Sequence, residues 1–238
     1  SSAASYLFKR QADNGKVGAV VEVNCETDFV GKNENFQELA RSIAKHVVET
    51  NPADVEALLA STMNDKTAKE IVTEAVANMG ENISIRRFVR YESKEGEVFS
   101  YIHGAGKIGV LVEMKGADAE LGKDISMQVA AANPSYMDRS EVSDEELEHE
   151  KNVLREQARN EGKPDAIIEK MVLGRVNKYY KEVCLVDQPF IKDGDISISK
   201  LLKSKGAEIV RFTRFQLGEG IEKKQDNLAE EVAKQINQ

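Results

Sequence analysis

Short runs rich in β-branched residues alternate along the chain with longer stretches whose apolar residues recur every three or four positions. The runs at 17–24 and 108–115 predict strands, because β-branched side chains pack well on a pleated surface. Each half ends in a further strand pattern, at 83–90 and 209–215, where arginines stand between or beside apolar residues. The stretch after the first run predicts a helix, and one face of it carries Phe36, Leu39, Ile43, Ala44 and Val47.

The two halves of the chain are related by an offset of 91 residues, which indicates an internal duplication. The same offset places Met127 and Ala131 opposite Phe36 and Ala40. We therefore predict an α+β fold of two duplicated subdomains, each a small antiparallel sheet with helices on one face. The matched positions are Gly18, Val20, Val21, Glu22, Val23, Gly31 and Lys32 with Gly109, Leu111, Val112, Glu113, Met114, Gly122 and Lys123.

The second half also carries an insertion of different character between Ala132 and Ile196. The run 143–146 reads Ser-Asp-Glu-Glu, which predicts a capping box at the start of a helix. The run 161–165 breaks the pattern, and a second helical stripe follows it. Because the stripes are narrow and the other faces are charged, we predict an antiparallel coiled-coil hairpin over 140–185. Its apolar positions are Leu147, Leu154, Ala158, Ile168, Met171, Val172, Val176, Tyr179 and Val183.

The last residues predict a C-terminal helix that begins after Asp226 or Asn227. Leu228, Val232 and Ile236 recur at a spacing of four, which places them on one face. A helix of about 12 residues is marginal alone, so we expect it to dock on the core or on a partner. The expected divisions are 1–106 for the first core subdomain, 107–139 and 186–221 for the second, 140–185 for the hairpin and 222–238 for the C-terminal helical module.

Composition narrows the classes of function. The 33 Lys and Arg residues against 41 Asp and Glu residues give a formal net charge of −8, which argues against direct nucleic-acid binding. No run approaches the roughly 18 apolar residues of a membrane helix, and no signal peptide opens the chain, so we expect no membrane partner. Cys25 and Cys184 have neither zinc-site spacing nor disulfide density, which favours a reducing compartment such as the cytoplasm.

Motifs for chemistry are weak. Residues 104–109 spell G-x-G-x-x-G, which would suggest a nicotinamide or flavin oxidoreductase, but the glycines lead into a strand instead of a helix. A hairpin turn is the favoured interpretation. His46, His103 and His149 are scattered, so we expect no metal site and no cofactor, and of these His103 is the best candidate for contact with a partner.

The segment 24–32 stands out because it joins a strand to a helix and yet carries Phe29. Connecting segments are normally polar, since their backbone faces water. At the offset of 91 residues, Asp28 and Phe29 match Ala119 and Glu120, so the shared fold does not require an aromatic residue here. Phe29 is either a hydrophobic staple folded onto its own helix or a side chain offered to a partner protein.

Met79 and Gly80 mark a second point of interest. Met79 ends a helix in which Ala75 and Val76 also lie, and Gly80 is expected to be its C-cap. From spacing alone, Met79 is more simply explained as part of the core.

Six motifs resemble the elongation factor Ts family in the family's own order and span nearly the whole chain. The resemblance implies the long, bacterial form with an inserted coiled coil. It also implies a small three-helix domain ahead of Ser1, so we expect this chain to be a core that lacks this N-terminal domain. The C-terminal helix has Asn227 where some members carry an aromatic residue. The motifs are EVNCETDFV at 22–30, GENISIRR at 80–87, YIHG at 101–104, IGVLV at 108–112, GKP at 162–164 and GEGIE at 218–222.

The resemblance implies a guanine-nucleotide exchange factor that promotes GDP release from elongation factor Tu in its GDP-bound or nucleotide-free form, without being an enzyme. Asp28 and Phe29, flanked by Thr27 and Val30, would enter the partner near its magnesium and phosphate site. Met79 and Gly80 would form a second contact strip, and His103 is expected near the same surface. The second subdomain would touch another domain of the partner, and the C-terminal helix would lean on its GTPase domain. A further alternative is a dimerisation module that self-associates through the 140–185 hairpin.

Overall fold

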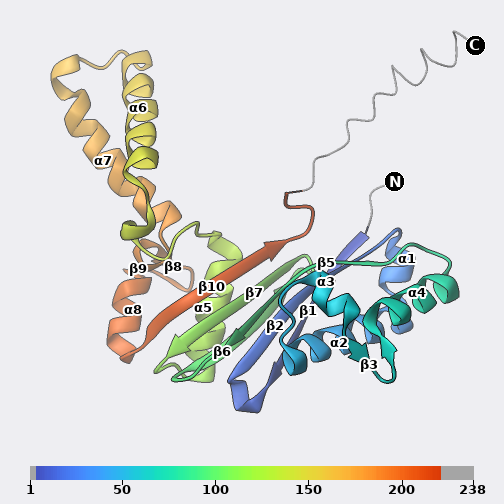
Figure 1. Ribbon diagram of the computed structural model, residues 1–238. Helices are drawn as coiled ribbons and strands as arrows, with labels where there is room; N and C mark the ends of the chain where they lie inside the picture. Colours follow the sequence, from blue (N-terminus) through green and yellow to red (C-terminus); the bar gives the residue numbers. More distant parts are fainter. Residues whose placement is uncertain (1–3, 221–238) are drawn as a thin grey trace, which may run out of the picture.

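The computed structural model describes residues 4–220 and contains two three-stranded antiparallel sheets of the same topology (Figure 1). In each sheet the second strand in chain order lies in the centre. This confirms the predicted α+β fold with two duplicated units. The first sheet has the order β1-β2-β5, formed by β1 (Ala4–Ala12), β2 (Val17–Cys25) and β5 (Ser84–Glu92). The second has the order β6-β7-β10, formed by β6 (Glu97–His103), β7 (Ile108–Lys115) and β10 (Glu208–Gln216).

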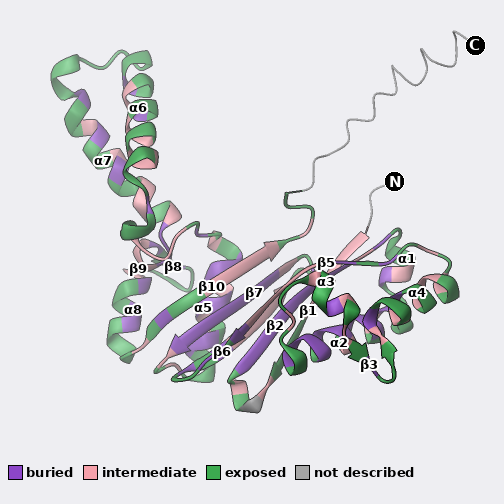
Figure 2. Ribbon diagram, viewed as in Figure 1, coloured by how far each residue is buried: buried purple, intermediate pink, exposed green. Residues whose placement is uncertain are grey.

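Helices cover the outer face of each sheet, and the inner faces pack on one another. The central strands are therefore buried on both sides, as the purple ribbons of Figure 2 show. The first sheet carries α1 (Asp28–Gly31), α2 (Glu34–Thr50), α3 (Val55–Ala60), the hairpin β3 (Thr62–Met63) and β4 (Lys66–Thr67), and α4 (Ala68–Met79). The second carries α5 (Ala119–Ala132), the hairpin β8 (Pro189–Phe190) and β9 (Asp193–Ser197), and α8 (Ile198–Lys205). Short 3-10 turns lie at Asp13–Gly15, Arg139–Glu141 and Leu185–Asp187.

The expected boundary after residue 106 is too late. Strand β6 pairs with β7, so the second sheet already begins at Glu97. The offset of 91 residues comes from the central strands β2 and β7. The first strand of each copy, β1 or β6, has a weaker alternation of apolar and polar residues, so the sequence does not show where each copy begins.

Two glycines related by the duplication allow the sheets to approach closely. A Cβ atom on Gly18 would lie 2.7 Å from Val98 Cγ1 and 3.0 Å from Leu111 Cδ1. A Cβ atom on Gly109 would lie 2.8 Å from Val20 Cγ1. Since Val20 and Leu111 are also duplicates, each glycine makes room for the side chain that the other copy places two residues along.

The helices follow a different offset from the strands. Buried positions of α2 match those of α5 at 82 residues, so that His46 corresponds to Gln128 and the left-handed C-cap Asn51 corresponds to Asn133. The difference, 91 − 82, means that the first copy has nine more residues between its central strand and its helix. Nine residues turn a helix by about half a revolution, so the predicted pairing of Ala40 with Ala131 is wrong: Ala40 is buried and Ala131 is exposed.

A buried carboxylate in each sheet binds an arginine that reaches across to the other sheet. In the first copy, Glu22 is fully buried and accepts a hydrogen bond of 2.6 Å from Arg87 Nε. The Arg87 guanidinium lies 4.1 Å from the centre of the Phe215 ring and donates to the Gln216 carbonyl at 3.1 Å. The paired charge, the aromatic face and the carbonyl together satisfy a group that would be costly to bury alone.

The second copy repeats this arrangement. Glu113 accepts a hydrogen bond of 2.6 Å from Arg211 Nε, and the Arg211 guanidinium lies 4.0 Å from the centre of the Tyr91 ring. Arg211 also donates to the Glu92 carbonyl at 3.5 Å. Arg211, Phe215 and Gln216 follow Arg87, Tyr91 and Glu92 by 124 residues, so both copies use the same latch reciprocally.

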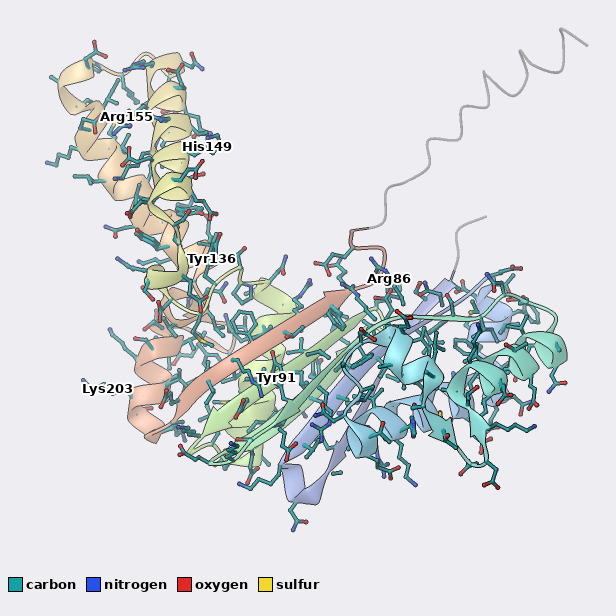
Figure 3. All side chains as sticks on the ribbon, in the orientation of Figure 1. Arg86, Tyr91, Tyr136, His149, Arg155 and Lys203 are labelled. Carbon is teal, nitrogen blue, oxygen red and sulfur yellow. The ribbon has the colours of Figure 1, made fainter. Side chains whose placement is uncertain are left out.

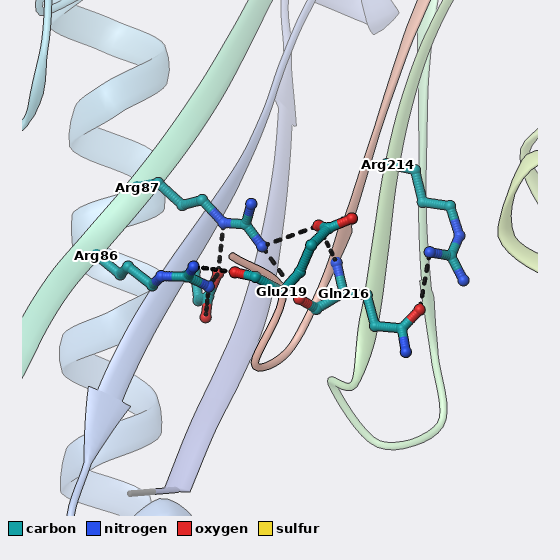
Figure 4. Close-up of polar contacts among 6 residues, drawn as sticks. Arg86, Arg87, Arg214, Gln216 and Glu219 are labelled. Carbon is teal, nitrogen blue, oxygen red and sulfur yellow. Dashed lines mark hydrogen bonds and ion pairs between the residues drawn. The ribbon is translucent and has the colours of Figure 1, made fainter. Parts of the chain in front are cut away.

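Arg86 is an addition that only the first copy makes. It donates to both Glu22 oxygens, at 3.0 and 3.1 Å, and to the Glu219 carbonyl (Figure 4). The position in β10 related to Arg86 by 124 residues is Val210, which is partly exposed. The first sheet therefore binds the turn after β10 with two arginines, because Arg87 also contacts the Glu219 carboxylate at 3.3 Å.

The predicted hairpin consists of α6 (Asp144–Asn160) and α7 (Asp165–Val183), which project away from the sheets (Figure 1). The two helices share a narrow apolar seam formed by Leu154, Ala158, Ile168, Val172 and Val176. Salt bridges between the helices flank this seam, as between Arg155 and Glu169 at 2.7 Å.

At the base of the hairpin, the predicted capping box forms only in part. Ser143 accepts from the Glu146 N–H at 3.1 Å, but the Glu146 carboxylate binds the hydroxyls of Tyr136 and Tyr179 instead of the cap backbone. Tyr136 lies where the hairpin joins the core (Figure 3). Arg139, which precedes the hairpin, pairs with Asp187, which follows it, at 3.0 Å. These contacts tie the two ends of the hairpin to one another and to the segments that connect it with the core.

The close approach of the sheets predicts the cost of a methyl group at Gly18. We expect Gly18→Ala to lower the free energy of unfolding by about 1–3 kcal/mol, because Val98 is a stiff neighbour and must shift. Urea denaturation followed by circular dichroism measures this. The matched control is Gly194→Ala, since Gly194 is exposed and a methyl group added there would meet no other atom within 4 Å; it should stay within about 0.5 kcal/mol. Equal effects of both substitutions would contradict the packing argument.

Candidate functional site

The nine extra residues of the first copy form a short turn with an aromatic side chain exposed at its surface. Helix α1 begins after the N-cap Thr27, whose side chain accepts from the Val30 N–H at 3.3 Å. Phe29 is the second residue of α1, and 91% of its surface is exposed. The staple interpretation is therefore wrong, because a staple would bury the ring against its own helix. The assignment of Asp28 and Phe29 to Ala119 and Glu120 is wrong too, since this turn has no counterpart in the second copy.

Tyr6 of strand β1 contacts the turn at two points. The Tyr6 hydroxyl donates to Asp28 Oδ1 at 2.9 Å. A Cβ atom on Gly31 would lie 1.9 Å from the Tyr6 ring, so glycine is required where α1 crosses this side chain. Tyr6 itself packs edge-on against Phe36 of α2, with ring centroids 5.9 Å apart. Through Tyr6, the turn rests on the core of the first subdomain.

The residues at the C-terminal end of α4 also contact the turn. Gly80 has φ of 73° and forms the left-handed C-cap, donating its N–H to the Val76 carbonyl at 2.9 Å. Glu81 follows and accepts hydrogen bonds from the backbone N–H groups of Glu26 and Thr27. Thus Thr27–Val30 and Met79–Gly80, which are far apart in sequence, lie beside one another.

Between α1, α2 and α4 lies a groove of about 440 Å³. Met79 is partly buried: it packs against the first core, as its spacing predicts, and it also lines this groove. Val30 of α1 lines the groove as well. Its lining combines the apolar residues Val30, Leu39, Ile71, Ala75 and Met79 with the polar residues Asn33, Asn35, Glu74 and Asn78.

His103 ends β6 and is exposed, with its Nδ1 atom 3.0 Å from the Tyr101 hydroxyl. The turn that follows contacts the first strand, since the Gly106 carbonyl accepts from the Leu7 N–H at 3.0 Å. A Cβ atom on Gly106 would lie 3.5 Å from the Tyr6 ring. Tyr6 therefore lies between the turn that carries Phe29 and the turn that follows His103.

The turn between β6 and β7 also shows that the G-x-G-x-x-G motif at 104–109 is not a dinucleotide-binding loop. It joins two strands, and Gly109 is buried in β7 against Val20, so no helix N-terminus is available to bind a pyrophosphate. The oxidoreductase alternative therefore loses its supporting motif.

The remaining predicted contact residues Leu228, Val232 and Ile236 lie outside the described residues. Within residues 4–220, no group of three or more His, Cys, Asp and Glu side chains is arranged to hold a metal ion. None of the helices described is both long and apolar enough to cross a membrane.

Sequence reasoning missed Glu81 and Tyr6. Glu81 had a detectable signal, because an acidic residue just after a helix C-cap opposes the helix dipole and so invites another explanation. Tyr6 had none, since its partners Asp28 and Gly31 are distant in sequence and belong to the segment without a counterpart.

Burial beneath the turn perturbs two acids. The pKa of Tyr6 is raised to about 12, first by burial and then by its hydrogen bond to Asp28. The pKa of the Cys25 thiol is raised to about 11, first by burial and then by the Glu81 carboxylate. The pKa of Cys184, below the hairpin, is likewise raised to about 11 by burial. All three groups stay protonated in the folded protein at neutral pH.

These shifts predict how stability depends on alkaline pH. The unfolded chain ionises its thiols near pH 9, whereas the folded protein keeps them protonated to about pH 11. The unfolded state therefore binds fewer protons in this window, and we expect the free energy of unfolding to be steady below about pH 9 and to fall above it. Urea midpoints between pH 7 and 10.5 measure this. Cys25→Ala should weaken the pH dependence, and an unchanged slope would contradict the assignment.

Comparison with known proteins places these features in a family. The family model described as "Elongation factor TS" matches residues 26–219. Elongation factor Ts of Clostridium perfringens strain SM101 is 51% identical over 94% of this chain and 78% of its own length. The proteins of the same name from Clostridium acetobutylicum and Syntrophotalea carbinolica are each 48% identical, over 95% and 93% of this chain and 78% of their own lengths. Since the family model covers most of the chain and the relatives align over nearly all of it, this chain belongs to the elongation factor Ts family of translation elongation factors.

Proposed function

We propose that the protein is a guanine-nucleotide exchange factor that promotes GDP release from elongation factor Tu. The observation that carries the proposal is Phe29, an almost fully exposed aromatic side chain on a turn that the duplicated scaffold does not need. Exposing a large aromatic ring to water is unfavourable, and burial in a partner is worth about 1.5–3 kcal/mol. The family membership supplies the kind of partner.

The proposed mechanism is mechanical displacement. Phe29 enters between packed elements of the partner next to the loop that holds Mg²⁺ and the β-phosphate of GDP, while Asp28 lies beside it. Parting these elements shifts the loop, so that the ion loses ligands and the phosphate loses charge compensation. No bond of substrate is made or broken by this chain, which acts by binding alone.

The remaining predicted residues enlarge the contact around this wedge. Val30 and Met79 line the groove beside the turn, and Gly80 follows Met79 as the C-cap of α4. His103 is exposed at the end of β6, just before the neighbouring turn, which Tyr6 connects to the turn of Phe29. We infer that the partner rests on both turns, and that the C-terminal helix with Leu228, Val232 and Ile236 adds a further contact.

Thermodynamic linkage fixes the sign of the effect. If the factor weakens nucleotide binding to elongation factor Tu, then nucleotide weakens binding of the factor by the same free energy. A buried aromatic side chain together with a disturbed metal shell can supply several kcal/mol. An exposed salt bridge, worth about 0–1 kcal/mol, cannot.

The proposal places the protein in the bacterial cytoplasm, where translation takes place, and it needs neither cofactor nor metal on this chain. Self-association through the 140–185 hairpin stays a prediction, compatible with exchange activity.

The proposal predicts that Phe29→Ala leaves the fold intact and slows GDP release stimulated by the factor. Loss of about 1.5–3 kcal/mol of burial corresponds to roughly 10- to 160-fold in rate. Release of a fluorescent GDP analogue from purified elongation factor Tu, followed by stopped flow, measures this. Leu173→Ala is the matched control, because Leu173 is a large exposed apolar residue on the hairpin. Wild-type release by Phe29→Ala would overturn the proposal.

A further inference from the structure

We infer that Glu81 is a positioning residue for nucleotide exchange: its carboxylate clamps the turn that carries Phe29. The inference rests on the proposed function and adds to it a residue that touches no part of the wedge side chain itself. Glu81 directly follows the C-cap Gly80 of α4, and it reaches across to the residues that precede α1.

Three hydrogen bonds make the clamp. Glu81 Oε2 accepts from the Glu26 N–H at 3.2 Å and from the Thr27 N–H at 3.1 Å. Glu81 Oε1 accepts from the Thr27 hydroxyl at 2.5 Å. Bonds to an ionised carboxylate are stronger than neutral ones, and both oxygens are engaged. All the hydrogen bonds that the structure of residues 4–220 gives to this carboxylate go to the turn.

The position of Glu81 argues against a role in stabilising α4. The C-terminal end of a helix carries a partial negative charge and favours cations, so a carboxylate there is unfavourable for the helix. The first turn of α4 already has a complete capping box of Thr67 and Glu70, so the helix is stabilised at its other end. The contacts of Glu81 are thus explained by the turn they hold.

Thr27 shows how the clamp reaches Phe29. The Thr27 oxygen that donates its proton to Glu81 also accepts from the Val30 N–H, which closes the first turn of α1 around Phe29. Tyr6 of β1 adds a hydrogen bond to the Asp28 side chain. Glu81 is the better residue to test, because it is half-buried at the surface, whereas Tyr6 also packs against Phe36 in the core.

Phe29 can part the packed elements of the partner only if the turn that carries it stays in place. A loosened turn can let the partner bind while Phe29 stays outside the nucleotide site, which lowers the coupling between factor and nucleotide. The expected signature is therefore a lower maximal rate of GDP release at saturating factor. Partial unfolding would instead lower the concentration of active factor and leave that maximal rate unchanged.

The experiment titrates elongation factor Tu bound to a fluorescent GDP analogue with wild-type protein, Glu81→Ala, Glu81→Gln and Glu49→Ala. We expect Glu81→Ala to lower the maximal rate by about 3- to 10-fold, with thermal unfolding close to that of the wild type. Glu81→Gln keeps one acceptor oxygen, so its maximal rate should lie between those of the wild type and Glu81→Ala. Glu49→Ala is the matched control, because Glu49 is an exposed carboxylate on α2 whose partner Lys45 lies 3.7 Å away at the surface.

A cycle with Phe29→Ala separates the two hypotheses. If Glu81 acts through Phe29, adding Glu81→Ala to Phe29→Ala should slow release no further. If Phe29→Ala alone is slow but Glu81→Ala keeps the wild-type maximal rate, the clamp is wrong and the proposed function stands. If both single variants release GDP like the wild type, the proposed function fails.

A direct measure of the turn uses the absence of tryptophan from the chain. In a Phe29→Trp variant, the fluorescence anisotropy of the single indole reports how freely the turn moves. Adding Glu81→Ala should lower the anisotropy, and adding Glu49→Ala should leave it unchanged. Equal anisotropy in all three proteins would overturn the clamp.

Discussion

The architecture depends on the packing of two like sheets, face to face, at a distance that only glycine allows at two related positions. Gly18 and Gly109 each make room for a side chain from the other copy, and the Arg87 and Arg211 latches bind across the same interface. Each sheet provides one glycine and one arginine to the interface, so the same two contacts occur once in each direction. The central strands are buried between a helix layer and a second sheet, which makes this interface a rigid base for the segments attached to it.

Function is best sought where the duplication fails. The first copy adds nine residues after its central strand, which form the Phe29 turn, and the second copy adds the α6–α7 hairpin after its helix. Neither addition is needed to complete a sheet or a core. Both are nevertheless anchored by specific polar contacts, Glu81 and Tyr6 in one case and Glu146 and Arg139 in the other. Such anchoring indicates segments that present a surface in a defined direction.

Much of the fold could be predicted from the sequence, because strands 17–25 and 108–115 and the hairpin helices have strong local patterns. The offset of 82 residues between the helices could not be predicted from the sequence. Gly31 matches Gly122 at the strand offset of 91 residues, so the sequence suggests that this offset continues past the nine extra residues. Within the site, the exposure of Phe29 was one of two open interpretations, and only tertiary structure could decide between them. Glu81 and Tyr6 escaped notice because their roles arise from hydrogen bonds between segments more than 20 residues apart.

The exposed ring and the rigid turn depend on one another. A single exposed aromatic residue on a mobile loop would collapse onto a nearby apolar surface, and the groove of Val30 and Met79 lies directly beside Phe29's turn. Glu81 and Thr27 hold the backbone before and after Phe29, and Tyr6 holds the Asp28 side chain beside it, so the ring stays in water in the free protein. In the exchange function that we propose, the free energy of burying this ring is kept for the partner, where it opposes the binding of nucleotide.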